Sequence, residues 1–309
     1  MNSIPKQIVT EVKKVIHGKD EVIEMMVCAI LAGGHVLLQD IPGVGKTTLA
    51  MTLKKAMSLS YRRVSFTPDV LPGDILGFQM YDRESGQFRF VEGSIYTNLF
   101  LADEINRTSP KTQSALLEVM EERKATVEGV ERAVPEPFFV IATQNPFGSS
   151  GTQRLPESQL DRFMVCLSMG YPKHQDAIEV LKGDSLTDME SVTPVADAET
   201  VLQMQKKTAQ IYVEDSLHDY IVRLTEATRD EKLFRLGLSP RGSIALLKMA
   251  RSRAFLSGRD YLIPEDVTDV FRPVANHRVQ WNTRAEISEH DAGERLLMVM
   301  DSVRQPRVN

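Results

Sequence analysis

A glycine-rich segment at residues 40–48 has the residue types of a phosphate-binding loop. It reads DIPGVGKTT, follows an apolar run at 35–39 that predicts a strand, and precedes a run at 49–57 that predicts a helix. Strand, glycine-rich loop and helix in this order form the context in which such a loop binds a nucleotide. The residues that we expect to contact the nucleotide here are Pro42, Gly43, Val44, Gly45, Lys46, Thr47 and Thr48.

The residue types in this loop have chemical reasons. Glycine at 43 and 45 lets backbone N–H groups turn toward phosphate oxygens, at the positive N-terminal end of the following helix. Lys46 can reach the β- and γ-phosphates, and the Thr47 hydroxyl can bind Mg²⁺. Asp40 departs from the pattern G-x-x-x-x-G-K-S/T, which has glycine at that position, although Pro42-Gly43 can still shape the turn.

Two adjacent carboxylates end a second apolar run. Residues 99–102 predict a strand, and Asp103 and Glu104 follow it directly. Acidic residues at the carboxyl end of such a strand face the ligand crevice of an open α/β sheet. We assign Asp103 to the Mg²⁺ ion and Glu104 to orienting and deprotonating the attacking water. A glutamate directly after the aspartate, without an N-K-x-D or T-K-x-D motif in the chain, favours ATP over GTP.

Two further polar residues could respond to the γ-phosphate. Asn145 follows the apolar run 138–142, at the tip of a strand that we expect beside the acidic pair. Arg162 precedes another predicted strand at the domain edge, where it could reach a neighbouring subunit's γ-phosphate as an arginine finger. The same arginine could instead pair with Asp161 or Glu157 on the surface.

Arg241 is a third candidate, in the C-terminal half of the chain. It lies in the first turn of a predicted helix that Ser239-Pro240 opens. A cation in a first turn interacts unfavourably with the helix dipole, and a nearby phosphate would remove that cost. We therefore expect Arg241 to face a nucleotide bound between the two domains of one chain.

The first 170 residues alternate apolar strands with helices. This alternation predicts a five-stranded parallel sheet that helices cover on both faces. Helical periodicity over residues 5–32, interrupted at Gly18, predicts two helices before the sheet. The predicted strands lie at 35–39, 61–66, 99–102, 138–142 and 163–167.

Two β-hairpins are inserted into this plan. One pairs 78–81 with 88–91 around a glycine-containing loop, and the other pairs 125–128 with 132–134 around Gly129.

Helical patterns dominate the remainder of the chain. Residues 183–196 are polar and predict a loop. We expect an α/β domain at residues 1–170 and a smaller, all-helical domain at 171–309. The helices expected there lie at 198–209, 215–229, 240–257, 264–276 and 287–304.

The bulk composition predicts a packed protein and argues against nucleic acid as a partner. The 309 residues are 42% hydrophobic and 26% charged, with a net charge of −5 and a pI of about 5.8. No apolar run is long enough to span a bilayer, and the N-terminus does not resemble a secretory signal. Cys28 and Cys166 lie in apolar runs without metal-ligand spacing, which favours buried thiols and a cytoplasmic location.

The motifs, in their order along the chain, resemble the MoxR family of AAA+ ATPases. The matching segments read PGVGKT, LFLADEINR, ATQNP, LPESQLDRF and LSPRG, and the likeness extends from His17-Gly18 to Asn276-His277-Arg278. The two hairpins resemble the helix-2 insert and the hairpin before the sensor-1 strand of that branch. The resemblance implies a P-loop NTPase fold with a helical lid.

The resemblance also implies roles for single residues. Asn145 would be sensor 1, Arg162 the arginine finger and Arg241 sensor 2. Arg107 would act across a subunit boundary. The segment that lines the adenine pocket would include Val15, Ile16 and Gly18.

The resemblance implies partners as well. Family members assemble as hexameric rings and act as chaperones, often for proteins with von Willebrand factor A domains and for metal-centre maturation. We therefore expect ATP and Mg²⁺ as cofactors, a hexameric homo-oligomer and a client protein.

Three other readings stay open. A nucleic-acid-acting AAA+ motor also carries hairpin inserts, but the acidic pI and the lack of an appended nucleic-acid module argue against it. A magnesium-chelatase-like motor subunit shares the inserts and a von Willebrand A-domain partner. A scaffold that binds nucleotide without hydrolysis is disfavoured by the presence of Lys46, Glu104 and Arg162.

Overall fold

The computed structural model describes residues 3–145, 155–182, 185–282 and 292–307. Its centre is a five-stranded sheet in the order β2-β5-β8-β1-β9, in which every neighbouring pair is parallel. The predicted parallel sheet is therefore confirmed. Its strands are β1 (Val36–Gln39), β2 (Tyr61–Ser65), β5 (Leu99–Asp103), β8 (Phe139–Gln144) and β9 (Val165–Leu167).

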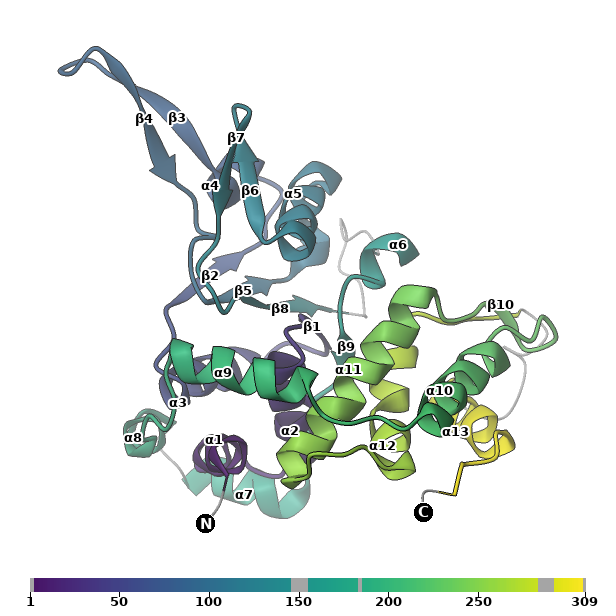
Figure 1. The fold of residues 1–309 in the computed structure, drawn as a ribbon. Helices are drawn as coiled ribbons and strands as arrows, with labels where there is room; N and C mark the ends of the chain where they lie inside the picture. The colour runs from purple at the N-terminus through teal and green to yellow at the C-terminus, as the bar shows by residue number, and fades with distance from the viewer. Residues whose placement is uncertain (1–2, 146–154, 183–184, 283–291, 308–309) are drawn as a thin grey trace.

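Helices cover both faces of this sheet, because successive side chains of each central strand point to opposite faces. In β5, for example, Leu99 and Leu101 join one buried apolar cluster, whereas Phe100 and Ala102 join the other. Figure 1 shows α5 on one side of the sheet and α1, α2 and α3 on the other. The bounds of these helices are Pro110–Glu122 for α5, Ile4–Lys13 for α1, Asp20–Leu31 for α2 and Lys46–Ala56 for α3.

The two predicted hairpins are present and project from the same end of the molecule (Figure 1). The first follows the short helix α4 (Pro72–Leu76) and pairs β3 (Gly77–Asp82) with β4 (Gln87–Glu92). The second pairs β6 (Lys124–Val127) with β7 (Val130–Ala133) directly after α5.

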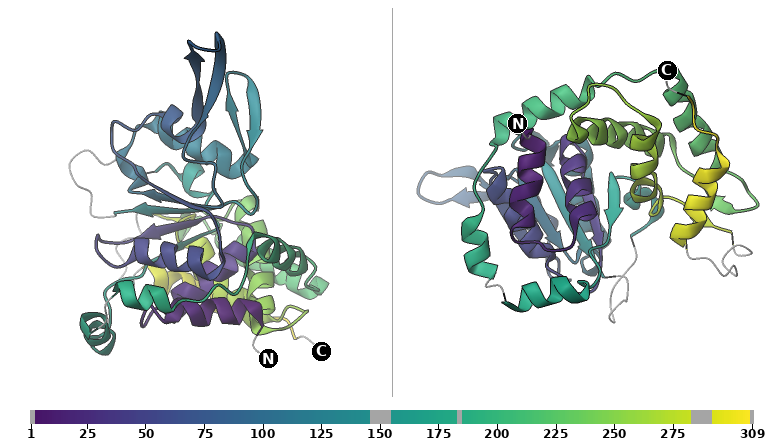
Figure 2. Two further views of the ribbon diagram at one scale, coloured as in Figure 1. Left: turned by 90° about the vertical axis from the view of Figure 1, so that its left-hand side faces the viewer. Right: turned by 90° about the horizontal axis from the view of Figure 1, so that it is seen from below.

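The C-terminal helices extend the apolar cluster beneath the sheet rather than forming a separate one. That cluster runs from Ile8 of α1 to Val299 near the C-terminus without a break at residue 170. Figure 2 shows α1 and α2 side by side under the sheet, with the C-terminal helices beside them. The division at residue 170 stays a prediction. The C-terminal helices are α9 (Ala198–Ala209), α10 (Asp215–Ala227), α11 (Pro240–Ser257), α12 (Pro264–Ala275) and α13 (Ala292–Ser302).

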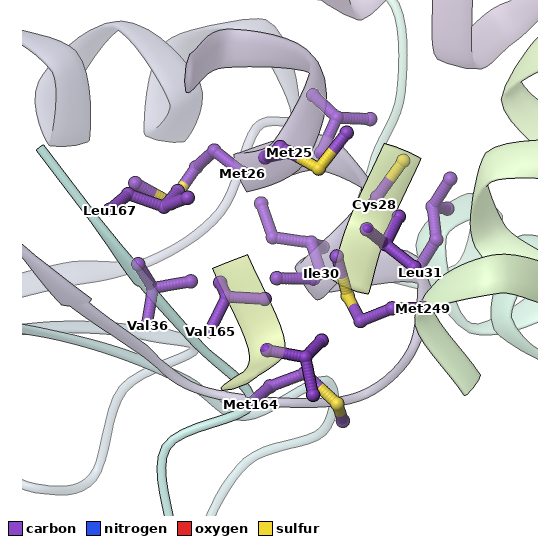
Figure 3. Close-up of a cluster of buried hydrophobic side chains, with 14 of the residues drawn as sticks. Met25, Met26, Cys28, Ile30, Leu31, Val36, Met164, Val165, Leu167 and Met249 are labelled. Atoms are coloured by element: carbon purple, nitrogen blue, oxygen red, sulfur yellow. The ribbon is translucent and has the colours of Figure 1, made fainter. Parts of the chain in front are cut away.

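The contact between α2, β9 and α11 shows how closely the two halves pack. In Figure 3, Ile30 and Leu31 of α2 lie with Met249 of α11 and Val165 of β9 in one buried cluster. Cys28 lies in the same cluster, and burial raises the pKa of its thiol to about 12. Cys166 is also free and buried, and its pKa is raised to about 12 for the same reason. Both cysteines are thus the buried apolar thiols that the sequence predicts.

Some elements differ from the prediction. Residues 183–196 are predicted as a loop, but α8 (Ser185–Ser191) forms there after α7 (His174–Lys182). Tertiary contacts override the polar composition, since Lys55 Nζ donates to the carbonyl of Met189 near the C-terminus of α8 (2.7 Å).

The lid region also contains a short strand pair that the sequence does not predict. The antiparallel strands β10 (Phe234–Leu236) and β11 (Gln280–Trp281) join the loops around α11 and α12. The start of the helix predicted at 287–304 lies outside the described residues. Over the part of the chain that the structure describes, none of the helices combines the length and apolar character needed to cross a bilayer.

Candidate active site

A cavity of about 410 Å³ lies at the carboxyl ends of β1, β5 and β8. Parallel strands end at one edge of a sheet, so the polar residues that follow them converge there. The glycine-rich loop, the acidic pair and Asn145 all line this cavity, whereas Val44 packs against the apolar cluster instead. The lining residues are Pro42, Gly43, Gly45, Lys46, Thr47, Thr48, Arg63, Asp103, Glu104 and Asn145.

The backbone conformation of the loop explains why glycine is present at positions 43 and 45. Gly43 and Gly45 have φ angles of 83° and 88°, in the left-handed region that side chains disfavour. A Cβ on Gly43 would meet nothing within 4 Å, so the backbone conformation requires glycine there rather than a lack of space. Gly45 is the N-cap of α3, and the first turn of that helix borders the cavity with N–H groups that lack intrahelical partners. This geometry fits an anion with several oxygens.

Asp40, which departs from the loop pattern, ties the loop to the segment after β9. Its buried carboxylate accepts hydrogen bonds from Ser168 Oγ (2.8 Å), Met169 N (2.5 Å) and Gly170 N (3.0 Å). A glycine could make none of these bonds. The departure is therefore compatible with the loop, and it fixes the loop against its neighbour in the fold.

Asp40→Gly would restore the glycine of the loop pattern, yet we expect this substitution to destabilise the folded protein. Losing an acceptor for three donors, of which the Met169 N–H is buried, should lower the free energy of unfolding by about 1–3 kcal/mol. Urea unfolding measures this loss, and titration with ATP should show weaker binding because the loop is less fixed. Ser168→Ala, which removes only one donor, should lose less. An Asp40→Gly protein as stable as wild type would contradict this account.

Lys46 is surrounded by acidic groups at the cavity wall. Its Nζ donates to the backbone oxygen of Asp40 (2.9 Å). Burial lowers the pKa of Lys46, and the carboxylates of Asp40, Asp103 and Glu104 act in the opposite direction. A bound phosphate would add negative charge beside the same ammonium, which favours its cationic form.

The acidic pair is held by a threonine on the next strand. Thr143 Oγ1 donates to Asp103 Oδ1 (2.6 Å) and accepts from the backbone N of Glu104 (2.8 Å). Glu104 has φ 57° and ψ 47°, a left-handed conformation that costs a non-glycine residue about 1–2 kcal/mol. The bond from Glu104 N to Thr143 helps to hold that conformation. Ala102 pairs with Ala142 in the sheet, so the register could have indicated Thr143 had the strand order been known.

Two arginines of the same chain also contact the acidic pair. Arg63 on β2 donates from Nη2 to Asp103 Oδ2 (2.6 Å), and Arg107 pairs through Nη1 with Glu104 Oε2 (2.6 Å). Sequence reasoning missed Arg63, because its relevance depends on β2 lying beside β5. Arg107, expected at a subunit boundary, here contacts the glutamate of its own chain.

Met169 lines a second cavity, of about 690 Å³. Its Cε lies 3.8 Å from where a Cβ on Gly45, in the wall of the first cavity, would be. Gly18, expected near the adenine, also lines this second cavity and has a φ of 68°. Val15 and Ile16 are instead buried in the apolar cluster, where they support the wall rather than form it.

Arg162 and Arg241 lie away from the cavity that the glycine-rich loop lines, which we call the phosphate cavity. Arg162 precedes β9, which runs parallel to β1, whereas the glycine-rich loop follows β1, so the two are at opposite edges of the sheet. Arg241 is beside Arg162, because both contact Glu121 at the end of α5. Arg241 therefore does not line the cavity of its own glycine-rich loop, and its expected contact with a nucleotide stays a prediction. Ser239 caps α11 by accepting from Gly242 N (3.1 Å), which places Arg241 at this edge.

This fold and site define a P-loop ATPase of the AAA type with a lid domain. Residues 35–165 match the family model described as "ATPase family associated with various cellular activities (AAA)", and residues 226–296 match the AAA lid domain.

Similar proteins narrow this class. The chain is 42% identical to the uncharacterised protein YeaC of Bacillus subtilis, over 96% of this chain and 93% of YeaC. It is 36% identical to the chaperone MoxR1 of Mycobacterium tuberculosis, over 98% of this chain and 83% of MoxR1. A solved structure from Cytophaga hutchinsonii matches with a TM-score of 0.89 and 34% identity, over 98% and 94% of the two chains. The chain belongs to the MoxR family of AAA+ ATPases.

Proposed function

We propose that the chain hydrolyses ATP at a site completed by a second copy of itself, within a ring expected to be a hexamer. The main support is the arrangement of two groups of residues. The glycine-rich loop, the acidic pair and Asn145 line one cavity, whereas Arg162 and Arg241 lie at the opposite edge of the sheet. Such a split supplies the two halves of a shared site when copies pack edge to edge.

The glycine-rich loop would bind the phosphates and the second cavity the base. Backbone N–H groups from Gly43 to Thr48 and the Lys46 ammonium would contact the phosphate oxygens. Met169, which lines the second cavity and lies near Gly45 of the first, would pack near the sugar or base.

Thr47 and Asp103 would hold Mg²⁺ together with the phosphates. Within the described ranges, His, Cys, Asp and Glu side chains form no cluster that could hold a metal by themselves. Mg²⁺ typically shares substrate phosphates with one or two carboxylates, so the residues present fit this ion. When bound, the ion would neutralise charge on the phosphate oxygens.

Glu104 would orient and deprotonate the attacking water, with Asn145 bonding to the γ-phosphate or the water. Arg162 and Arg241 of the next copy would stabilise the charge on the transferring phosphoryl group. This assignment moves Arg241 from the lid of its own chain to the boundary between chains.

The output that we propose is the remodelling or maturation of a client protein. The name of MoxR1, a chaperone, supports this direction. The β3–β4 hairpin exposes Phe78, Met80, Tyr81 and Phe88, which provides an apolar surface for contact with a protein. A client with a von Willebrand factor A domain or a maturing metal centre, and a cytoplasmic location, stay predictions.

ATP hydrolysis measured across a wide range of protein concentration tests the shared site. We expect turnover per chain to rise with concentration, because the site of an isolated copy lacks Arg162 and Arg241 of a neighbouring copy. Turnover that stays constant while light scattering shows a change from monomer to oligomer would refute the shared site. If the protein binds ATP but shows no turnover at any concentration, the alternative of a scaffold that binds nucleotide without hydrolysis would be favoured.

A further inference from the structure

Two arginine side chains converge on a single carboxylate at the edge of the sheet opposite the phosphate cavity. Arg162 Nε lies 3.2 Å from Glu121 Oε2, and Arg241 Nη2 contacts Glu121 Oε1. The three side chains are between 31% and 46% exposed, so the cluster is open to the surface. Each guanidinium therefore faces a different oxygen of the same anion.

A buried network holds the backbones of both arginines in place. Arg278 is almost fully buried, and its guanidinium donates to Asp161 Oδ1 (2.8 Å), to the backbone oxygen of Phe163 (2.5 Å) and to that of Met164 (3.0 Å). The other oxygen of Asp161 accepts from Ser239 Oγ (2.9 Å), the N-cap of α11. The segment before β9 and the start of α11 are thus joined, which fixes the separation of the two arginines.

The charges of this cluster favour a stronger anion than a carboxylate. Three arginines, at 162, 241 and 278, face two carboxylates, at 121 and 161, which leaves a net charge of +1 (3 − 2). A phosphoryl group offers three oxygens and more charge than a carboxylate. Ion pairs that are one-third exposed are weak and screened by water, so such an anion can replace Glu121 at little cost.

We propose that Glu121 occupies the place of the γ-phosphoryl oxygens and holds Arg162 and Arg241 until the nucleotide of an adjacent copy replaces it. This proposal rests on the shared site proposed above. Glu121 then has two effects. It keeps two like-charged side chains together before assembly, and it competes with the neighbouring nucleotide for them afterwards. Competition dominates because Arg278 and Asp161 already fix the backbones.

Glu121→Gln tests the competition, with Glu118→Gln as the matched control. Glu118 is exposed on the same helix, so its substitution removes the same charge from α5. The measurement is ATP turnover against protein concentration, with urea unfolding as a check on folding. We expect Glu121→Gln to lower the half-activating concentration about two- to fivefold, the range for an exposed ion pair, without reducing turnover at saturation. Glu118→Gln should match wild type.

The outcomes separate this proposal from the shared site itself. If Glu121→Gln leaves the half-activating concentration unchanged, raises it, or lowers turnover at saturation, Glu121 only positions the arginines and the competition is refuted. If wild type shows no dependence on concentration, the shared site fails and this proposal fails with it.

Discussion

Glu104→Gln is expected to bind ATP about as well as wild type while its turnover falls at least about 100-fold, the lower range for removing a general base. Glutamine has nearly the same size as glutamate, so the left-handed backbone at 104 and the bond from its N to Thr143 should persist. The side chain would lose the ability to accept a proton from water. Asp103 and Lys46 would still bind the metal and the phosphates.

The measurement pairs phosphate release with a separate ATP titration. Glu122→Gln, at an exposed position on α5, is the control for loss of a charge. Glu104→Gln also removes the ion pair with Arg107, so a small change in ATP affinity would reflect that arginine rather than the base. Near-normal turnover in Glu104→Gln would refute the assignment of the water-activating residue. A loss of binding equal to the loss of turnover would show instead that Glu104 acts on the bound nucleotide.

The centre of the site could be predicted because its parts are local in the sequence. The phosphate loop needs only one strand, its glycines and the next helix, and all of these are contiguous around Gly43 and Gly45. The acidic pair needs only to end a buried strand, since parallel strands bring their carboxyl ends to one edge. This rule about parallel strands is therefore enough to predict the place of three residues that line the cavity, Asp103, Glu104 and Asn145.

The other contacts depend on which elements become neighbours, and local patterns in the sequence do not reveal this. Arg63 contacts Asp103 only because β2 pairs with β5 in a particular register. From the sequence, Asp40 is only a departure from the loop pattern. Its role becomes visible when the segment at 168–170 lies against it in the fold. An arginine at the start of a helix, such as Arg241, indicates a nearby anion. The sequence does not show whether that anion belongs to the same chain or to a neighbouring one.

The same limit explains the errors in the C-terminal half. Within the polar stretch at 183–196, residues 185–191 form α8, and Lys55 of α3 donates to the carbonyl oxygens of Met189 and Glu190 near its end. In the two short strands β10 and β11, the tilted rings of Phe234 and Trp281 contact each other with their centroids 4.4 Å apart. Strongly periodic helices such as α10 and α12 were predictable from the spacing of their apolar residues, whereas these short elements depend on distant partners.

Arg162→Ala is expected to lower turnover by about 10³-fold or more, the range for an arginine finger, while ATP still binds to the chain that carries the substitution. The reason is geometric, because Arg162 lies at the opposite edge of the sheet from its own phosphate loop. Arg223→Ala is a suitable control. Arg223 is 37% exposed and pairs with Asp219, much as Arg162 is 31% exposed and contacts Glu121.

Mixing two inactive variants gives the sharper form of this experiment. Lys46→Ala chains should bind ATP poorly but retain a normal Arg162, and Arg162→Ala chains should bind ATP but lack the finger. Where a Lys46→Ala chain presents its arginine to the nucleotide of an Arg162→Ala chain, one complete site forms. The mixture should therefore hydrolyse ATP faster than either variant alone, with a maximum near equal amounts. A mixture no faster than its parts, although an affinity tag on one variant co-purifies the other, would mean that Arg162 acts within its own chain or only in folding.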